Sequence, residues 1–383
     1  MNRNRTISAF LPREPRCRRR LGHCAPRRDR FIGLHFSEIT GRLEREDKFY
    51  GKGGVMKRTA LGIFLVFLAV SAFPAKAQQA EEILKAVVKI NATIPAEAFT
   101  AKTLGMEREG NGVVIDSKGL ILTTGYLILE AERIEILGPD GKAIPGNFVG
   151  YDHETGFGLL RAEKPLNVEP LKIGDSSKVE EGDPVLVASY GGKDSVQGAR
   201  VIARKEFAGY WEYILENAIF TAPPYVGFGG AALIGRDGKL LGIGSLFTQM
   251  VFPGLGSIPC NVFIPIDLLS PILNDLIGKG RPGKSLRPWL GVNVEEAHGR
   301  VFIKKVTPGG PAEKGNLQAD DLILTVNGKA VSNLADLYRK VWALGEAGVE
   351  VTLGVLRGIE IREVKVRTAD RYQFLQLKPK KLL

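Results

Sequence analysis

Few residues after position 77 could carry out nucleophilic or acid–base chemistry. The histidines there are His153 and His298, and the single cysteine is Cys260. Hydrolysis by an activated nucleophile needs a Ser, Thr or Cys beside a base, which a third group orients. The glycine-rich segment 223–233 contains none of these three nucleophiles. We expect both histidines to be solvent-facing loop residues. Cys260 lies in the apolar run 259–264, and we expect it to be a buried structural thiol.

The positive charge of the chain is confined to its first 77 residues. The 383 residues carry a net charge of +11. Residues 1–77 hold 17 Lys and Arg against 6 Asp and Glu, and the remainder holds 36 of each kind. A nucleic-acid-binding domain would carry a basic excess of its own. We therefore expect no nucleic-acid partner.

Residues 56–77 have the composition of a bacterial Sec signal peptide. Met56-Lys57-Arg58 precedes an apolar run to Ala72, and Ala75-Lys76-Ala77 forms an A-x-A cleavage site. The sequence predicts a periplasmic or secreted protein that starts near Gln78 and keeps no membrane span after cleavage. An uncleaved anchor is the alternative. Because signal peptides act from the amino terminus, we expect Met56 to be the true start and residues 1–55 not to be translated.

The rest of the chain divides into a β-rich region and a smaller mixed module. Short β-branched runs between 110 and 246, separated by Gly and Asp-Gly turns, predict an all-β barrel or sandwich. Residues 81–90 predict a short helix that turns into a strand, and 265–276 predict a closing helix. The polar run 278–284 predicts a linker. Beyond it, one helix over 333–344 and strands near 289–294, 301–306, 321–326, 350–356 and 360–366 predict an α+β module.

Ordered motifs carry a resemblance to a known family. In the first region they are Gly110–Ile115, Gly119–Tyr126, Asp152–Leu160 and Gly227–Gly230, and in the second they are Arg287–Val292, Gly310–Lys314 and Asp320–Gly328. Together they resemble the HtrA/Deg family of exported trypsin-like proteases. The resemblance implies a mainly β fold. A trypsin-like double β-barrel would span 78–278, a linker 279–286, an α+β PDZ domain 287–368 and a basic tail 369–383.

The sequence departs from this family at the three catalytic positions. By the resemblance, Tyr126 stands at the base, Gly156 at the orienting acid and Gly229 at the nucleophile. A phenol with a pKa near 10 is a poor base at neutral pH, and glycine supplies neither a carboxylate nor a hydroxyl. We therefore expect a pseudoprotease with no catalytic residue, no cofactor and no metal. The alternative is an active serine endopeptidase with an unconventional site at Ser195 or Ser245, although the sequence shows no base for either.

The resemblance also implies a peptide-binding groove in the PDZ domain. An extended peptide would add to a sheet edge while main-chain N–H groups of Leu290, Gly291 and Val292 hold its carboxylate. The other residues expected at the groove are Trp289, Val294, Leu337 and Val341. Alternatively, Trp289 and the helix residues only pack the core. The expected partners are peptides or protein carboxyl termini, active HtrA homologues, or two further copies in a homotrimer.

Overall fold

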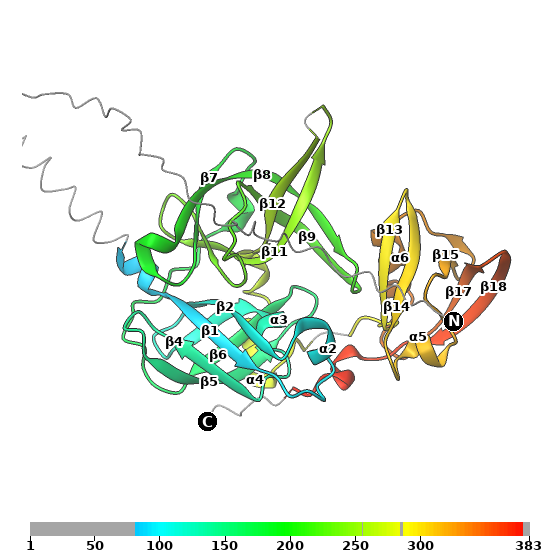
Figure 1. The fold of residues 1–383 in the computed structure, drawn as a ribbon, viewed down its shortest axis with the longest axis horizontal. Coiled ribbons are helices and arrows are strands. Elements are labelled where there is room, and N and C mark those ends of the chain that lie inside the picture. Colours follow the sequence, from blue (N-terminus) through cyan, green and yellow to red (C-terminus); the bar gives the residue numbers. More distant parts are fainter. Residues whose placement is uncertain (1–80, 255, 284–285, 378–383) are drawn as a thin grey trace, which may run out of the picture. The chain divides into compact units, whose positions relative to one another are not determined.

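The computed structural model describes residues 81–254, 256–283 and 286–377 (Figure 1). All of them belong to one compact unit. The predictions for residues 1–55 and for the signal peptide 56–77 lie outside the described residues, as do Lys284 and Ser285 of the linker and the end of the tail. Within the described ranges, no helix combines the length and the apolar character needed to cross a membrane.

Six antiparallel strands close the first barrel in the order β1-β2-β3-β6-β5-β4. A helical turn at 81–85 leads into β1, as the sequence predicts. On β1 the alternate residues Val88, Ile90 and Ala92 are buried while Lys89 and Asn91 between them are partly exposed, which is the period of two that a strand with one core face requires. The elements are β1 (Val87–Thr93), α2 (Ala101–Leu104), β2 (Glu107–Val114), β3 (Leu120–Thr124), α3 (Gly125–Ile128), β4 (Arg133–Leu137), β5 (Ala143–Tyr151) and β6 (Phe157–Ala162).

The second barrel closes in the order β10-β11-β12-β9-β8-β7. The hairpin β8–β9 is paired to its tip, where Gly209 lies opposite Tyr213. Cys260 is free and fully buried on β12, as predicted. The elements are η1 (Ser176–Lys178), β7 (Pro184–Ala188), η2 (Gly192–Ser195), β8 (Val196–Gly209), β9 (Tyr213–Ala222), β10 (Ala232–Ile234), β11 (Leu240–Phe252) and β12 (Gly256–Pro265).

The predicted closing helix over 265–276 is wrong in its extent. The chain forms a 3-10 turn, η3 (Ile266–Leu268), and then a separate helix, α4 (Leu273–Lys279). Pro271 explains the break, because proline lacks an N–H and disfavours the helical conformation of the residue before it. The helix ends at Gly280, whose φ of +74° is the left-handed conformation of a helix cap.

The module after the linker is a small sheet in the order β13-β14-β15-β17-β18, with β16 paired to β15. Asn333 caps α6 by accepting the N–H of Asp336 at 2.8 Å, so the helix lies where the sequence predicts it. The elements are β13 (Val292–Ala297), β14 (Arg300–Val306), α5 (Pro311–Lys314), β15 (Leu322–Val326), β16 (Lys329–Ala330), α6 (Leu334–Trp342), β17 (Glu350–Arg357), β18 (Glu360–Arg367) and η4 (Arg371–Phe374).

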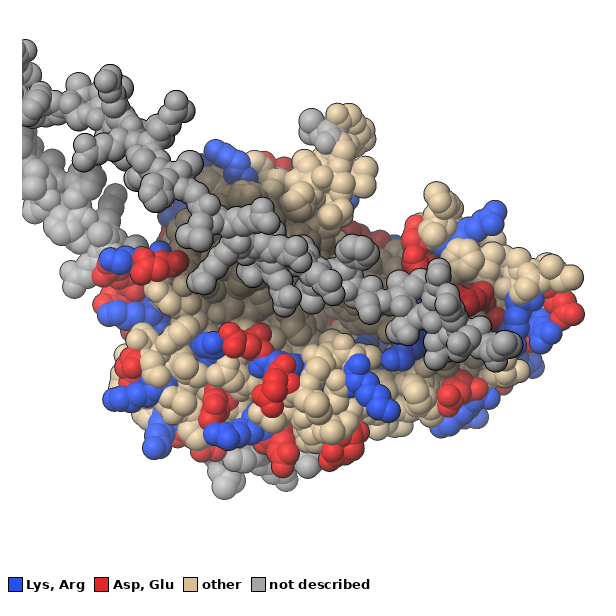
Figure 2. Space-filling model, viewed as in Figure 1, with Lys and Arg blue, Asp and Glu red and all other residues tan. Residues whose placement is uncertain are grey.

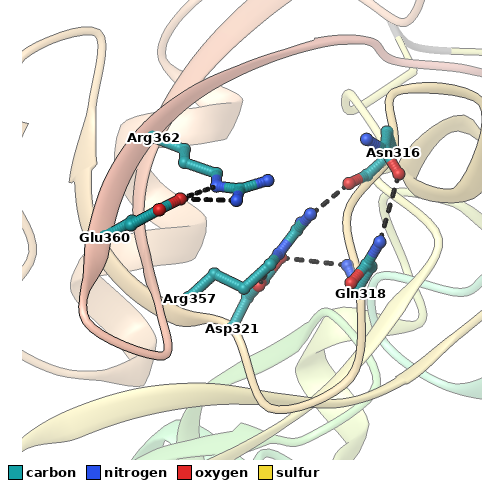
Figure 3. A network of polar contacts seen from close by, with 6 residues as sticks. All are labelled: Asn316, Gln318, Asp321, Arg357, Glu360 and Arg362. Atoms are coloured by element: carbon teal, nitrogen blue, oxygen red, sulfur yellow. Dashed lines mark hydrogen bonds and ion pairs between the residues drawn. The ribbon is translucent and has the colours of Figure 1, made fainter.

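A buried ion pair fixes the turn before β15 to β17. Fully buried Asp321 accepts two hydrogen bonds from Arg357, at 2.6 and 2.7 Å, and a third from the Gln318 N–H at 2.9 Å (Figure 3). On the neighbouring hairpin, the pair of Glu360 with Arg362 is largely exposed. In Figure 2, acidic and basic side chains are interspersed on the visible face rather than gathered into one patch of a single sign.

Candidate functional site

Tyr126, Gly156 and Gly229 come from three separate elements of the barrels. Tyr126 lies on α3 after β3, Gly156 between β5 and β6, and Gly229 in the loop before β10. The Gly125 N–H donates to the Gly156 carbonyl at 2.7 Å, which ties the first two positions together. A Cβ atom on Gly229 would lie 2.8 Å from the Tyr126 hydroxyl. The fold therefore gathers these three positions in one place.

The Tyr126 phenol is suited to filling space rather than to proton transfer. Burial raises its pKa above the ordinary value of 10.0, because the charged phenolate would lose its hydration. The side chain is therefore a neutral phenol at neutral pH and cannot serve as a general base. Its hydroxyl occupies the volume that any side chain at position 229 would need.

The backbone at Gly156 also differs from a site for an orienting acid. Its φ of +86° is left-handed, a conformation that side-chain-bearing residues rarely adopt. A Cβ there would lie 3.3 Å from the hydroxyl of Tyr213, which in turn donates to the Thr155 carbonyl at 2.7 Å. Tyr213 is buried and belongs to β9, so the second barrel supplies a phenol beside this position.

Asn111 on β2 positions the glycine-rich loop, a role that the sequence analysis missed. Its amide Nδ2 donates to the carbonyls of Gly227 and Gly229, at 2.9 and 3.0 Å. Its backbone N–H donates to the Gly229 carbonyl at 2.8 Å, and its Oδ1 accepts the Tyr190 N–H at 2.9 Å. The one available signal was a polar side chain between two glycines, Gly110 and Gly112, just before the apolar residues Val113 and Val114.

A pocket of about 380 Å³ opens beside this cluster. Its lining includes three aromatic residues, Tyr126, Tyr190 and Phe228, together with Gly229. Among the described residues, no group of three or more His, Cys, Asp or Glu side chains is placed to hold a metal ion. The pocket is therefore a small, partly apolar recess with the Tyr126 phenol in its wall.

The prediction that both histidines face solvent is wrong for His153. Its side chain is only 8% exposed and its ring packs edge-on against Tyr372, with the ring centres 5.3 Å apart. The Tyr372 hydroxyl also accepts the His153 N–H, so the closing segment after the PDZ sheet covers this loop. His298 is exposed, as expected. Ser195 and Ser245 lie on η2 and β11 of the second barrel.

The predicted groove residues of the PDZ domain fall into two groups. The N–H groups of Leu290, Gly291 and Val292 converge on a single carboxylate, that of Glu212 at the tip of the β8–β9 hairpin. Leu337 and Val341 are buried in one hydrophobic cluster with Leu290, Val292 and Val294. Trp289 lies apart from these residues, because its ring packs against Phe374 and Phe99. No local sequence pattern around Glu212 indicated its role.

Two closed six-stranded barrels followed by a PDZ sheet define the class of trypsin-like proteins with a carboxy-terminal PDZ domain. The family model of the trypsin-like peptidase domain matches residues 110–243, and that of the PDZ domain matches 288–368. The chain belongs to the HtrA/Deg family.

The relatives are bacterial and carry periplasmic names. The periplasmic pH-dependent serine endoprotease DegQ of Escherichia coli is 30% identical over 71% of this chain and 60% of its own length. A probable periplasmic serine protease, do/HhoA-like, of Haemophilus influenzae is 30% identical over 67% of this chain and 57% of its own length. The chain thus spans well under two thirds of these relatives. The solved serine endoprotease from Yersinia pestis is 25% identical, with a TM-score of 0.46 over 76% of this chain and 97% of that one.

Proposed function

We propose that this chain is an exported HtrA-family pseudoprotease in which Tyr126, Gly156 and Gly229 hold the positions of the base, the acid and the nucleophile. The observation that carries the proposal is the 2.8 Å between the Tyr126 hydroxyl and the Cβ that Gly229 lacks. The volume of a nucleophilic side chain is filled by a phenol. The periplasmic names of the relatives and the predicted signal peptide support a place in the periplasm.

The chemistry of the residues at the three catalytic positions supports the loss of hydrolysis. Gly229 carries no nucleophile, the neutral Tyr126 phenol accepts no proton at pH 7, and Gly156 orients nothing. Removing the catalytic groups of a serine protease costs about 10⁶-fold in kcat. What such a scaffold retains is its capacity to bind.

The PDZ domain is the proposed binding module, for peptides or protein carboxyl termini. Three consecutive N–H groups lie 2.7 to 3.0 Å from the oxygens of one carboxylate, a spacing that suits the terminal carboxylate of a peptide. Strand β13 is at the edge of its sheet and can pair with an extended chain. Such a protein would act as a chaperone-like binder or as a regulator of active homologues, alone or as a homotrimer.

Labelling with a fluorophosphonate tests the loss of catalysis. We expect residues 78–383 to remain unlabelled and to leave casein uncleaved. The competing function, an endopeptidase with a displaced site, requires labelling that disappears in Ser195→Ala or Ser245→Ala. Ser257→Ala, at an exposed serine of β12, is the matched control. Labelling abolished by either of the first two variants would overturn the proposal.

Peptide binding is tested with pairs of acid and amide ligands. The probe is a pool of fluorescein-labelled octapeptides with random internal positions and a Val, Leu or Phe carboxyl terminus. We expect residues 78–383 to prefer the free acids over the amides by about 1.5–3 kcal/mol, the value of charge-assisted hydrogen bonds. Equal anisotropy titrations for the two pools would contradict carboxylate recognition.

A further inference from the structure

The carboxylate-binding loop of the PDZ domain already holds a carboxylate from the same chain. Oε2 of Glu212 accepts the N–H of Leu290 at 2.8 Å, and Oε1 accepts those of Gly291 and Val292 at 2.7 and 3.0 Å. Glu212 is 3% exposed. The residues in contact are 78 to 80 positions apart along the chain. A peptide terminus would need the same three donors.

The hairpin tip also makes a backbone hydrogen bond to the edge strand of the PDZ sheet. The Val294 N–H donates to the Tyr210 carbonyl at 2.9 Å. Residues 210–212 form the turn of the hairpin, so this contact occupies one main-chain donor of β13 that an extended peptide would use.

The apolar side of the groove is filled from the same hairpin. Ile214 on β9 is buried and belongs to the hydrophobic cluster of the PDZ domain, which includes Leu290, Leu337 and Val341. Removal of such a side chain from water favours the docked hairpin. A carboxylate, a paired backbone and an apolar side chain are the three features by which a peptide terminus would be recognised.

Further polar contacts fix the orientation of the tip. The Tyr338 hydroxyl on α6 donates to the Gly209 carbonyl at 2.8 Å and accepts the Glu212 N–H at 3.0 Å. The Arg339 guanidinium pairs with Glu206 on β8. Glu212 itself has a φ of +59°, which is uncommon for a residue with a side chain and persists only where the surroundings hold it.

We propose that the hairpin tip Tyr210–Glu212 is an internal ligand of the PDZ groove, so that a peptide carboxyl terminus binds the chain by displacing the Glu212 carboxylate. The inference rests on the proposed peptide-binding function and adds the element that competes for the site. The loop has three donors, and they cannot hold two carboxylates at once. The apparent affinity for a peptide is therefore the affinity of the open groove multiplied by the fraction of molecules in which it is open.

The structure leaves an approach for the incoming peptide. Beside the docked tip lies a pocket of about 640 Å³, whose lining includes Tyr210, Phe247, Val294 and Leu334. The middle of a peptide can contact β13 there before its terminus reaches the loop. Exchange of Glu212 for the peptide carboxylate would then be stepwise.

The test compares residues 78–383 of the wild type with Glu212→Ala and Glu212→Gln at pH 7. Glu216→Gln is the matched control, since it removes the same charge from the same hairpin where the side chain is 74% exposed and lies 4.0 Å from Arg339. Hydrogen–deuterium exchange of peptides covering 290–294 reports occupancy of the loop. Anisotropy titration with the free-acid octapeptide pool reports competition.

We expect Glu212→Ala to exchange faster over 290–294 and to bind the pool about 10-fold more tightly, the gain for a groove that is closed in about nine molecules of ten. Glu212→Gln, which is neutral like the protonated side chain, should change both measurements less than Glu212→Ala. The Glu216 control should match the wild type. Unchanged exchange in both Glu212 variants would overturn the internal ligand, and binding of the pool by the wild type would then still uphold peptide recognition. Faster exchange with no binding by any variant would support the docked carboxylate and contradict the proposed peptide-binding function.

Discussion

The Tyr126 hydroxyl and the Cα of Gly229 face each other so closely that a Cβ on Gly229 would lie 2.8 Å from the phenol oxygen. Real Cβ atoms essentially never approach a heavy atom this closely. The two positions are therefore coupled, because a side chain at position 229 would require the end of the Tyr126 side chain to move. Asn111 holds the loop before β10 by donating a hydrogen bond to the Gly229 carbonyl, so the loop keeps its conformation without a side chain at position 229.

The coupling predicts a destabilised Gly229→Ala variant. The added methyl group must displace the Tyr126 ring, and over-packing of this kind costs about 1–3 kcal/mol. Tyr126→Phe removes the hydroxyl and should recover most of the loss in the double variant. Urea unfolding measures the free energies. Gly198→Ala is the control, since a Cβ there has open space. Additive effects of Gly229→Ala and Tyr126→Phe would contradict the coupling.

Restoring the triad with Tyr126→His, Gly156→Asp and Gly229→Ser should not restore turnover. Gly229 has an ordinary φ, and the left-handed glycine of this loop is its neighbour Gly230 at +73°. The obstacle lies at position 156, where φ is +86° and the Tyr213 hydroxyl stands 3.3 Å from the new Cβ. Strain of this kind costs about 1–3 kcal/mol. Casein cleavage measures the result, and robust turnover would mean that only three side chains separate this fold from an active protease.

The ion pair of Asp321 with Arg357 should stabilise the PDZ domain far more than its exposed neighbour. Arg357→Met leaves the fully buried Asp321 carboxylate without its cation, which costs about 3–5 kcal/mol. Arg362→Met breaks a pair with Glu360 that solvent screens, and should cost less than about 1 kcal/mol. Both arginines are drawn in Figure 3. Thermal unfolding followed by circular dichroism compares them, and equal losses would contradict the role of burial.

Peptide binding should weaken as the pH falls from 7 to 5.5. Burial raises the pKa of Glu212 in the docked hairpin, although the three N–H groups and the Arg371 charge oppose the shift. Because the docked state binds a proton more tightly than the open state, acid favours docking. The stabilisation of the docked state by protonation is complete below the ordinary pKa of a carboxyl group. It is lost as the pH rises through the pKa that Glu212 has in the docked state.

The control for this pH dependence is the variant Glu212→Gln, whose side chain does not titrate. The peptide carboxylate, with a pKa of about 3.5, stays ionised throughout this range. We expect the affinity of the wild type for the octapeptide pool to fall as the pH is lowered, and that of the variant to stay constant. The Tyr338 hydroxyl, which also faces Glu212, remains neutral because burial raises its pKa. If the affinity of both proteins changed equally with pH, the effect would belong to a group other than Glu212.

The order of the domains and most of their helices and strands can be read from local patterns in the sequence. Alternating apolar residues define strands locally, and Asn333 marks the start of α6, so these features are legible without tertiary contacts. The sequence also showed Gly156 and Gly229 as departures from the family pattern and Gly291 as a match to it. Local signals also have limits, since apolar spacing over 265–276 predicted one helix where Pro271 divides two.

Only the tertiary structure decided what surrounds these positions. Glu212 stands in a turn with no pattern of its own, and its three partners lie 78 to 80 residues away, so its role depends on how the hairpin meets the PDZ edge. His153 is buried because Tyr372, more than 200 residues later, closes over it. The Tyr126 phenol fills the space at Gly229 because α3 of one barrel faces the loop of the other. Contacts of this range depend on packing between distant segments, and no local periodicity records them.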